Sequence, residues 1–393
     1  MMCLLVVASF SPTCYAQNEV PATSIDSIIE KIRLETGIVG MSAAIIKHKK
    51  VVWMKGYGYA DEKANIPFTA STIMNVASIS KTFTGVCIMK AVEQGKLLLD
   101  EDINRYLPFK VVNPYYPNEK ITLRHLATMT SGLVDRHPFY GDSTYFDEKD
   151  SPEPLGHFVK NYFVMGGSHY SKENFLQKKP GTYREYSNIG AALAGYIVEF
   201  ATGQKLNIYG KQYIFEPLKM EHTGWLIAEV DLKRHSKLYD KKSDGIKEIP
   251  LYGLTTYPDG GVRTSVASLS KFFISLLNEG EYKHTRILKE ESVAVMTKFQ
   301  YTALNKPENV SIEKLNQGIF WATKLGATRM GHNGSDHGVR TFMLSDLKKE
   351  IGVVIFFNTS LGEEEEGKYF DVYEALYKYA ETLESKEWQK RNL

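Results

Sequence analysis

The stretch Asn75-Val76-Ala77-Ser78-Ile79-Ser80-Lys81-Thr82-Phe83-Thr84 decides both the fold and the chemistry that we expect of this chain. Ser78 and Lys81 are three residues apart at the start of a predicted helix, a spacing that puts both side chains on one helix face. A serine hydroxyl is a weak nucleophile until a neighbouring base or cation stabilises the loss of its proton, and a partly desolvated lysine can do either. The positive end of the helix also favours a developing oxyanion. We therefore predict that Ser78 is a nucleophile activated by Lys81.

The Ser-x-x-Lys spacing is a weak signal when it stands alone. Three other pairs in the chain share it: Ser268/Lys271, Ser311/Lys314 and Ser345/Lys348. Only Ser78 opens a predicted helix directly after the first predicted strands, and only Ser78 precedes two further elements that would complete a site. Order and context therefore favour Ser78.

The second element is Tyr186-Ser187-Asn188, in a Pro-Gly turn that leads into a predicted apolar helix at residues 191–200. A tyrosine near a cation can act as general base, because the cation stabilises its phenolate. We predict this role for Tyr186 and expect Asn188 to hold Lys81 or a substrate amide. Tyr116-Pro117-Asn118 has the same spacing, but it lies in a polar loop with no helix after it.

The third element is His332-Asn333-Gly334-Ser335, at the end of a predicted strand. Gly334 would let substrate approach the strand edge closely. The backbone amides of Ser78 and Ser335 would then form an oxyanion hole, with His332 and Asn333 beside the substrate. His222-Thr223-Gly224 competes with this motif, but it has no adjoining paired strand and follows Asn188 closely.

With these three elements in order, the chain resembles the serine β-lactamase and penicillin-binding-protein superfamily, in its class C-like branch of D-amino peptidases, carboxypeptidases, esterases and acyltransferases. Two fragments support the resemblance: Leu123-Arg124-His125-Leu126-Ala127-Thr128-Met129-Thr130-Ser131-Gly132-Leu133 and Pro258-Asp259-Gly260-Gly261-Val262-Arg263-Thr264-Ser265. It implies that Ser78 is acylated and that Lys81 and Tyr186 shuttle its proton.

The chain departs from that family pattern at two positions. Met129 stands where the signature usually has histidine, a change that we interpret as structural. His332 stands where efficient β-lactamases carry a lysine that helps to receive the substrate carboxylate. A histidine is mostly neutral at pH 7 unless a neighbour raises its pKa, so we expect weak or no β-lactamase activity. Arg340, on the next predicted strand, would either replace that charge or, as is more frequent, form a surface ion pair.

The pattern along the chain predicts an α+β fold. Strands at both ends would form one antiparallel sheet flanked by terminal helices, with a large, mostly helical insertion between them. We predict helices at residues 24–36 and 369–383, and strands at 39–47, 51–59, 329–332, 339–345 and 351–358. The Tyr- and Pro-rich residues 138–170 are expected to form a loop over the cleft between sheet and insertion, where they would shelter an apolar acceptor from water.

Residues 1–16 have an apolar core followed by small and polar residues, as a signal peptide cleaved before Gln17 would have. We therefore expect an exported, periplasmic protein. Ser11 disfavours a lipid anchor on Cys14, because an apolar residue is expected at that position. Residues 17–393 would form one catalytic unit, with a sheet subdomain at about 22–70 and 320–393 and a helical subdomain at about 71–319. After cleavage Cys87 is the only cysteine, which excludes an intramolecular disulfide.

The amino-acid composition limits the kinds of binding partner that we expect. The 48 Lys and Arg residues nearly balance the 46 Asp and Glu residues, so we expect no nucleic-acid partner. No later stretch of about 18 apolar residues predicts a membrane span. His332 and His337 flank a loop without a helical Glu partner, so we expect neither a metal nor a cofactor.

The sequence thus predicts a serine hydrolase or acyltransferase that acts on an ester or amide through a Ser78 acyl-enzyme. The alternative is a binding protein that senses penicillins or wall fragments without turning them over. The substrate and the oligomeric state stay open.

Overall fold

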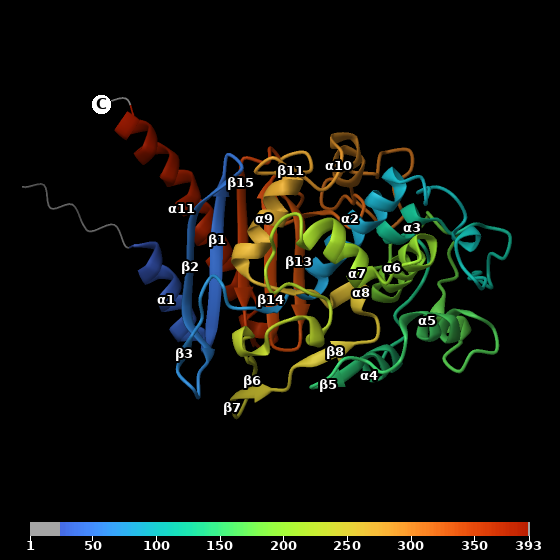
Figure 1. The fold of residues 1–393 in the computed structure, drawn as a ribbon, viewed down its shortest axis with the longest axis horizontal. Helices are drawn as coiled ribbons and strands as arrows, with labels where there is room; N and C mark the ends of the chain where they lie inside the picture. The colour runs from blue at the N-terminus through green and yellow to red at the C-terminus, as the bar shows by residue number, and fades with distance from the viewer. Residues whose placement is uncertain (1–23, 392–393) are drawn as a thin grey trace, which may run out of the picture.

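The computed structural model describes the backbone of residues 24–391 and the side chains up to residue 383. The predicted signal peptide, residues 1–16 with Cys14, lies outside the described residues. The predicted α+β architecture is confirmed: an antiparallel sheet contains strands from both ends of the chain, and a mostly helical part lies beside it (Figure 1). Among the described helices, none is both long enough and apolar enough to cross a membrane.

The main sheet has seven strands in the order β12-β13-β14-β15-β1-β2-β3. The N-terminal hairpin meets the C-terminal strands through β1 and β15, where Ile45 pairs with Val353. The strands are β1 (Gly40–Lys47), β2 (Lys50–Asp61), β3 (Ile66–Pro67), β12 (Ala322–Lys324), β13 (Arg329–Asp336), β14 (Val339–Asp346) and β15 (Ile351–Phe357). The sequence placed the end of β13 too early, because the strand continues through the 332–335 motif.

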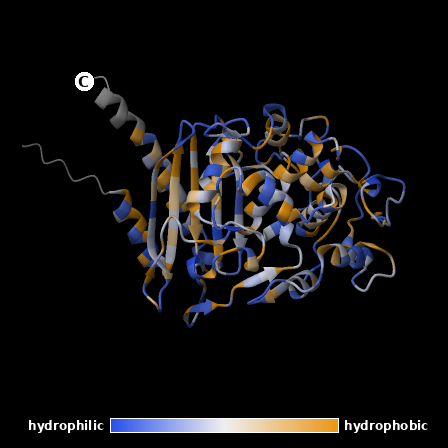
Figure 2. Ribbon diagram, viewed as in Figure 1, coloured by the Kyte–Doolittle hydropathy of each residue, from blue (hydrophilic) through white to orange (hydrophobic). Residues whose placement is uncertain are grey.

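Both faces of the central strands are covered. Helices α1 (Ile25–Thr36) and α11 (Gly367–Arg391) pack on one face, and α9 (Val266–Leu277) packs on the other (Figure 1). Alternate residues of β1 therefore enter different apolar clusters: Ala44 faces the helical part, and Ile45 faces α1 and α11. Figure 2 shows the apolar central strands between these layers. Such burial on both faces explains why β1 has a nearly continuous apolar sequence.

Local capping interactions, as well as packing, determine where the terminal helices begin and end. The Ser24 side chain accepts a hydrogen bond from the Ser27 N–H (3.2 Å) and caps α1. Gly37 ends that helix in the left-handed conformation, with φ 75°. Helix α11 is longer than the predicted 369–383.

The helical part lies on the α9 side of the sheet. Its helices are α2 (Ser80–Glu93), α3 (Leu123–Ala127), α4 (Phe139–Thr144), α5 (Leu155–Phe163), α6 (Asn188–Thr202), α7 (Leu206–Gly210), α8 (Tyr257–Gly260) and α10 (Glu290–Thr297). A short 3-10 turn, η1 (Ala77–Ile79), leads into α2. Small antiparallel pairs brace this part: β4 (Met74–Asn75) with β9 (Arg263–Thr264), β5 (Tyr145–Asp147) with β8 (Tyr252–Leu254), and β10 (Glu281–Tyr282) with β11 (Thr285–Arg286). A further small sheet joins β16 (Thr359–Ser360), β6 (Leu238–Lys242) and β7 (Gly245–Ile249).

Residues 138–170 are not the irregular loop that the sequence predicted. They contain α4, β5 and α5, and the side chains of Phe158 and Tyr162 are fully buried. The pairing of β5 with β8 places Asp147 opposite Tyr252. Helix α5 does have an amphipathic pattern, because Leu155, Phe158 and Tyr162 recur at helical spacing and are buried, and the loop prediction overlooked it. Helix α4 and strand β5 are shorter and are held by packing and strand pairing.

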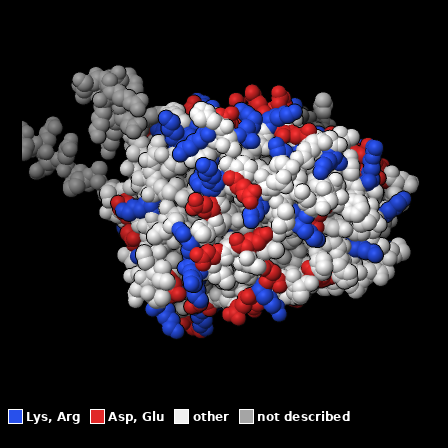
Figure 3. All heavy atoms as spheres, viewed as in Figure 1, with Lys and Arg blue, Asp and Glu red and all other residues white. Residues whose placement is uncertain are grey.

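Charges of both signs are interspersed over the face of the molecule shown in Figure 3. That distribution agrees with the near balance of acidic and basic residues in the sequence.

Candidate active site

The turn that carries Ser78 is held in a strained conformation. Ala77 has φ 48°, a left-handed value that is uncommon for a residue other than glycine. The preceding residue anchors the turn: the Val76 N–H donates to the Val262 carbonyl (2.8 Å), and the Val76 carbonyl accepts from the Thr341 hydroxyl (2.9 Å). Contacts from two sides thus fix Ser78 at the entrance to α2.

Lys81 is fully buried, and its ammonium group contacts three acceptors. Nζ lies 3.1 Å from Ser78 Oγ, 2.6 Å from Asn188 Oδ1 and 2.8 Å from the backbone oxygen of Asp259. Because a lysine ammonium has three N–H donors, these contacts use all of them. We call Ser78, Lys81, Asn188 and Asp259 the lysine cluster.

Electrostatics keep Lys81 protonated. Burial alone would lower the pKa of Lys81, but Tyr186 and the carboxyl groups of Asp259 and Asp135 outweigh it and raise that pKa overall. Burial raises the pKa of Asp259 to about 6, although Lys81 and a hydrogen bond from the Tyr140 hydroxyl (2.8 Å) oppose the shift. Lys81 is therefore a cation at neutral pH that stabilises negative charge on Ser78 Oγ.

The start of α6 brings the second motif to Lys81. The Asp135 carboxylate accepts from the Asn188 N–H (2.9 Å) and the Ile189 N–H (2.8 Å), as acidic groups commonly do at a helix N-terminus. The centroid of the Tyr186 ring lies 5.1 Å from Lys81 Nζ. Tyr186 and Asn188 therefore both lie beside Lys81.

The fragment at residues 123–133 supports the Tyr186 turn through its backbone. The Met129 carbonyl accepts from the Glu185 N–H (2.9 Å), and the Thr130 carbonyl accepts from the Gly181 N–H (2.8 Å). Met129 itself is buried.

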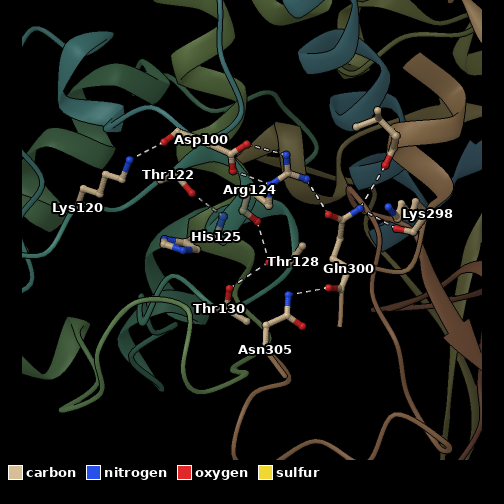
Figure 4. A network of polar contacts seen from close by, with 11 residues as sticks. Asp100, Lys120, Thr122, Arg124, His125, Thr128, Thr130, Lys298, Gln300 and Asn305 are labelled. Atoms are coloured by element: carbon tan, nitrogen blue, oxygen red, sulfur yellow. Dashed lines mark hydrogen bonds and ion pairs between the residues drawn. The ribbon is translucent and has the colours of Figure 1, made fainter. Parts of the chain in front are cut away.

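A polar network anchors the same fragment to its surroundings. Figure 4 shows Arg124 between Asp100 and Gln300: its guanidinium donates to both Asp100 carboxylate oxygens (2.6 and 2.7 Å) and to Gln300 Oε1 (2.7 Å). The Thr128 hydroxyl donates to the Arg124 carbonyl (2.7 Å). We infer a structural role for this fragment, because it positions the turn that carries Tyr186.

The side chains of the third motif, residues 332–335, lie alternately on the two faces of β13. Gly334 pairs with Thr341, and a Cβ added to Gly334 would lie 2.4 Å from the Val76 oxygen and 2.4 Å from Thr341 Oγ1. Gly334 therefore allows β13 to approach the turn that carries Ser78, in addition to the close approach of substrate that the sequence predicted. His332 lies on the same face as Gly334, because side chains alternate along a strand.

Asn333 and Ser335 lie on the opposite face of β13. Asn333 pairs with Phe342, and the Phe342 ring packs against Phe370 and Tyr373 of α11. This register corrects the expectation that the Asn333 side chain touches substrate. Ser335 nevertheless lines the cavity at Ser78, so its backbone is the part that can reach an oxyanion.

His332 does not replace the family's lysine as a cation. It is buried, and its Nδ1 lies 2.7 Å from the Asn333 carbonyl. Burial, followed by the nearby charges of Lys324 and Lys81, holds the pKa of His332 well below its usual range. Arg340 does not supply the charge either, because its side chain lies over the Phe370 ring and within 3.9 Å of Glu366.

A cavity in two parts opens at Ser78. The inner part has a volume of about 50 Å³, and residues of the lysine cluster, Ser335 and Asp336 line it. The outer part has a volume of about 710 Å³ and shares Tyr140, Tyr145 and Asn188 with the inner part. The discounted motif around His222 lies at a different hollow, of about 600 Å³, that shares no lining residue with these two parts.

Several residues at the site were not predicted from the sequence. The Asp259 carbonyl binds Lys81, yet only the resemblance of residues 258–265 to a family fragment pointed to this segment. Asp135, Tyr140 and Asp336 had no signal of their own. No cluster of three or more His, Cys, Asp or Glu side chains suited to a metal occurs among the described residues.

The sequence model of the beta-lactamase family matches residues 25–376. The chain belongs to the beta-lactamase family. It is 27% identical to Protein flp of Staphylococcus aureus over 338 residues, which cover 85% of this chain and 62% of that protein. It therefore spans less than two thirds of the length of that relative.

Solved structures agree with this family assignment. A penicillin-binding protein homologue from Pyrococcus abyssi, described as octameric, has a TM-score of 0.67 and 27% identity, with 86% of this chain and 73% of that chain covered. The D-amino acid amidase of Ochrobactrum anthropi SV3 has a TM-score of 0.69 and 22% identity, with 92% and 99% covered. The amidase likeness shows the shared fold.

Proposed function

We propose that this beta-lactamase family member is a serine hydrolase or acyltransferase that forms an acyl-enzyme on Ser78 from an ester or amide. The observation that carries the proposal is the position of the Lys81 ammonium, which binds both Ser78 Oγ (3.1 Å) and Asn188 Oδ1 (2.6 Å) while fully buried. A buried cation at hydrogen-bond distance from a serine oxygen is the arrangement that stabilises a nucleophilic alkoxide.

In the proposed first step, Ser78 Oγ attacks the substrate carbonyl and its proton passes to Tyr186. Lys81 stabilises the charge on the attacking oxygen, and the N–H groups of Ser78 and Ser335 receive the oxyanion. Tyr186 then protonates the leaving group, which departs as an alcohol or amine. In the second step, water or another acceptor attacks the acyl carbonyl and gives its proton to Tyr186, which returns it to Ser78 Oγ as the ester bond to the serine breaks and the acyl group is released. The identity of the acceptor decides between hydrolysis and acyl transfer.

The site does not favour penicillins. His332 is buried and neutral at the position where efficient β-lactamases present a lysine, and Arg340 lies on the opposite face of the sheet. His332 therefore offers no cation to a free carboxylate on the substrate, so we expect weak β-lactamase activity or none. The name of the amidase relative supports an amide as one substrate class.

Intact-protein mass spectrometry tests the proposal directly. Wild-type protein, Ser78→Ala and the matched control Ser311→Ala would each be treated with a fluorophosphonate, p-nitrophenyl esters and penicillins. Ser311 precedes Lys314 by the same spacing as in the predicted pair, and both are exposed. We expect a single adduct and ester turnover in the wild type and in Ser311→Ala, and neither in Ser78→Ala.

Other outcomes of this experiment point elsewhere. A folded wild-type protein that takes up no label would overturn the assignment of Ser78. A penicillin adduct on Ser78 that persists without turnover would instead favour the alternative of a binding protein or sensor.

A further inference from the structure

The inner part of the cavity at Ser78 is small. Its volume is about 50 Å³, whereas that of the outer part is about 710 Å³. One water molecule needs about 10–15 Å³ of such space and about two to four polar partners. An acyl chain of more than a few carbons would therefore have to extend into the outer part, whereas a water fits within the inner part.

Polar groups dominate the lining of the inner part. Most of its lining residues carry a hydroxyl, amide or carboxyl group, among them Tyr140, Thr256 and Asp259. Leu254 is the one large aliphatic side chain among the described residues that line it. An apolar chain placed against a carboxyl group would give it no hydrogen bond in exchange for those of water. The inner part therefore favours a small molecule that can both donate and accept hydrogen bonds.

The Asp259 carboxyl group can accept a hydrogen bond from such a molecule. Its side chain is buried, and Oδ2 accepts from the Tyr140 hydroxyl (2.8 Å). The Thr256 hydroxyl also hydrogen-bonds this carboxyl group. An ionised carboxyl group can accept about four hydrogen bonds, so these two donors use about half of its acceptor sites.

Lys81 influences the Asp259 carboxyl group through its charge. All three N–H donors of Lys81 bind other atoms, one of which is the backbone oxygen of Asp259. Burial raises the pKa of Asp259 to about 6, and the charge of Lys81 opposes that rise. The carboxyl group is therefore mostly ionised at neutral pH, and an ionised acceptor forms the stronger hydrogen bonds.

The inner part also borders the bond that breaks when the acyl group is released. Ser78 and Ser335, whose N–H groups are expected to receive the oxyanion, both line it. The carbonyl carbon of an acyl group on Ser78 Oγ would therefore lie at this space. A water that donates a hydrogen bond to Asp259 there could approach the carbonyl carbon to about 3–3.5 Å, the separation from which attack occurs.

We propose that the inner part binds the hydrolytic water and that the Asp259 carboxyl group orients it, so that the enzyme hydrolyses its acyl-enzyme in preference to transferring the acyl group to an alcohol or amine. The water donates one hydrogen bond to Asp259, attacks the carbonyl carbon and gives its other proton to Tyr186. Tyr186 returns that proton to Ser78 Oγ as the ester bond breaks, and the acyl group leaves as a carboxylic acid. The inference rests on the proposed function, because it concerns the second step at Ser78.

The first test measures the two chemical steps separately. With p-nitrophenyl acetate, rapid release of p-nitrophenol reports acylation, and decay of the acetyl adduct in intact-protein mass spectrometry reports deacylation. Asp259→Asn keeps the shape of the side chain without its charge, and Asp259→Ala removes the acceptor. We expect deacylation to fall at least about tenfold in Asp259→Asn and further in Asp259→Ala, while acylation changes less than about threefold. The control Asp371→Asn, exposed on α11, should change neither step.

The pH dependence of deacylation gives a readout that a purely structural role would not change. In the wild type, deacylation should rise with pH through about 6, because Asp259 becomes ionised there. The rise should be absent in Asp259→Asn. The other titratable groups around this carboxyl group are those of Lys81, Tyr140, Tyr145, Asp135 and Asp336. All of them remain in the variant, so a rise that persists would belong to one of them and would overturn the role of Asp259.

A second test offers the acyl-enzyme two acceptors. Ethanol is added to the reaction with p-nitrophenyl acetate, and ethyl acetate and acetate are quantified by chromatography. Both products come from the same acetyl-enzyme, so their ratio does not depend on the rate of acylation. We expect the wild type to form mainly acetate, and expect Asp259→Asn to raise the ratio of ethyl acetate to acetate at least about fivefold. An unchanged ratio would overturn the proposed selection of water.

The remaining outcomes separate this inference from the proposed function. Equal losses of acylation and deacylation in Asp259→Asn would overturn the water site and show that Asp259 acts through Lys81. If the inner part receives the acyl chain instead, Asp259→Asn should change the ratio of the acylation rates for p-nitrophenyl butyrate and acetate, and that result would also overturn the water site. A folded wild-type protein that forms no acetyl adduct on Ser78 would overturn the proposed function, and the water site with it.

Discussion

Lys81 and Asp336 are two ionisable residues near Ser78, and their surroundings differ. Lys81 is fully buried, and all three of its donors find acceptors inside the protein. Asp336 is half-buried and accepts hydrogen bonds from the Tyr145 hydroxyl and the His337 N–H, and no ion pair to it occurs among the described residues. The comparison teaches that the charge of Lys81 is balanced by partners at close range, whereas Asp336 is held mainly by hydrogen bonds from uncharged groups.

The largest effect is expected from removing the charge of Lys81, whose three hydrogen-bond acceptors all lie within the protein. In Lys81→Met, Ser78 loses its activating cation, so ester turnover should fall at least about 1000-fold. Asp259 and Asp135 also lose their shared counter-charge, which should lower the free energy of unfolding by about 3 kcal/mol. Turnover of p-nitrophenyl esters and urea denaturation measure the two effects. Lys314→Met, in the exposed pair of the same spacing, should change neither, and near-normal turnover by Lys81→Met would remove lysine from the mechanism.

The pH dependence of stability tests the electrostatic surroundings of Asp259, the carboxyl group next to Lys81. Burial raises the pKa of Asp259 from its ordinary 3.8 to about 6, so the folded state binds this proton more tightly than the unfolded chain does. That contribution to stability is fully present below pH 3.8 and is lost as the pH rises through about 6. It corresponds to about 3 kcal/mol. Asp259→Asn should therefore gain stability relative to wild type between pH 4 and pH 7 in urea titrations, and a constant difference would contradict the shift.

The sequence predicted the residues of the lysine cluster better than the other residues that line the cavity at Ser78. Ser78 and Lys81 belong to one local pattern, and Asn188 begins a helix with its own apolar sequence, so spacing and order were sufficient. Asp259 contributes a backbone carbonyl, which no side-chain pattern marks. Asn333 was expected beside the substrate, but the predicted strand ended at residue 332, so the alternation that places its side chain on the other face of β13 from Gly334 was not considered.

The cavity at Ser78 depends on pairings between distant segments. Tyr145 and Tyr252 come together only because β5 pairs with β8, and Asp336 joins them because β13 continues past the glycine motif. The β5–β8 pair has no periodic sequence signal, since each of its strands contains three residues. Such short elements take their conformation from tertiary contacts, which local propensity does not describe.

Tyr140 connects the two regions, and its removal should have an intermediate effect. Its hydroxyl donates to Asp259 Oδ2 (2.8 Å), and its side chain lines both parts of the cavity at Ser78. Tyr140→Phe leaves a buried carboxylate with one donor fewer, so the free energy of unfolding should fall by about 1–2 kcal/mol in urea denaturation. Exposed Tyr115→Phe serves as the control. An equally stable Tyr140→Phe would mean that Lys81 and Thr256 are sufficient partners for the Asp259 carboxyl group.

The smallest expected effect is a gain of stability in Asp336→Asn. It tests whether the surroundings of Lys81 and Asp336 differ as described. Asp336→Asn keeps a side chain of the same shape whose oxygen can still accept from Tyr145 and His337, and it removes a charge that burial destabilises, since burial raises the pKa of Asp336. Without substrate, the variant should be more stable than wild type by about 1 kcal/mol at pH 8 in urea denaturation. The gain should shrink in acid, because a raised folded pKa means that the wild-type carboxyl costs stability only where it is ionised. A loss of stability comparable to that of Lys81→Met would show that the protein stabilises the charge of Asp336, and the two residues would then not differ as described.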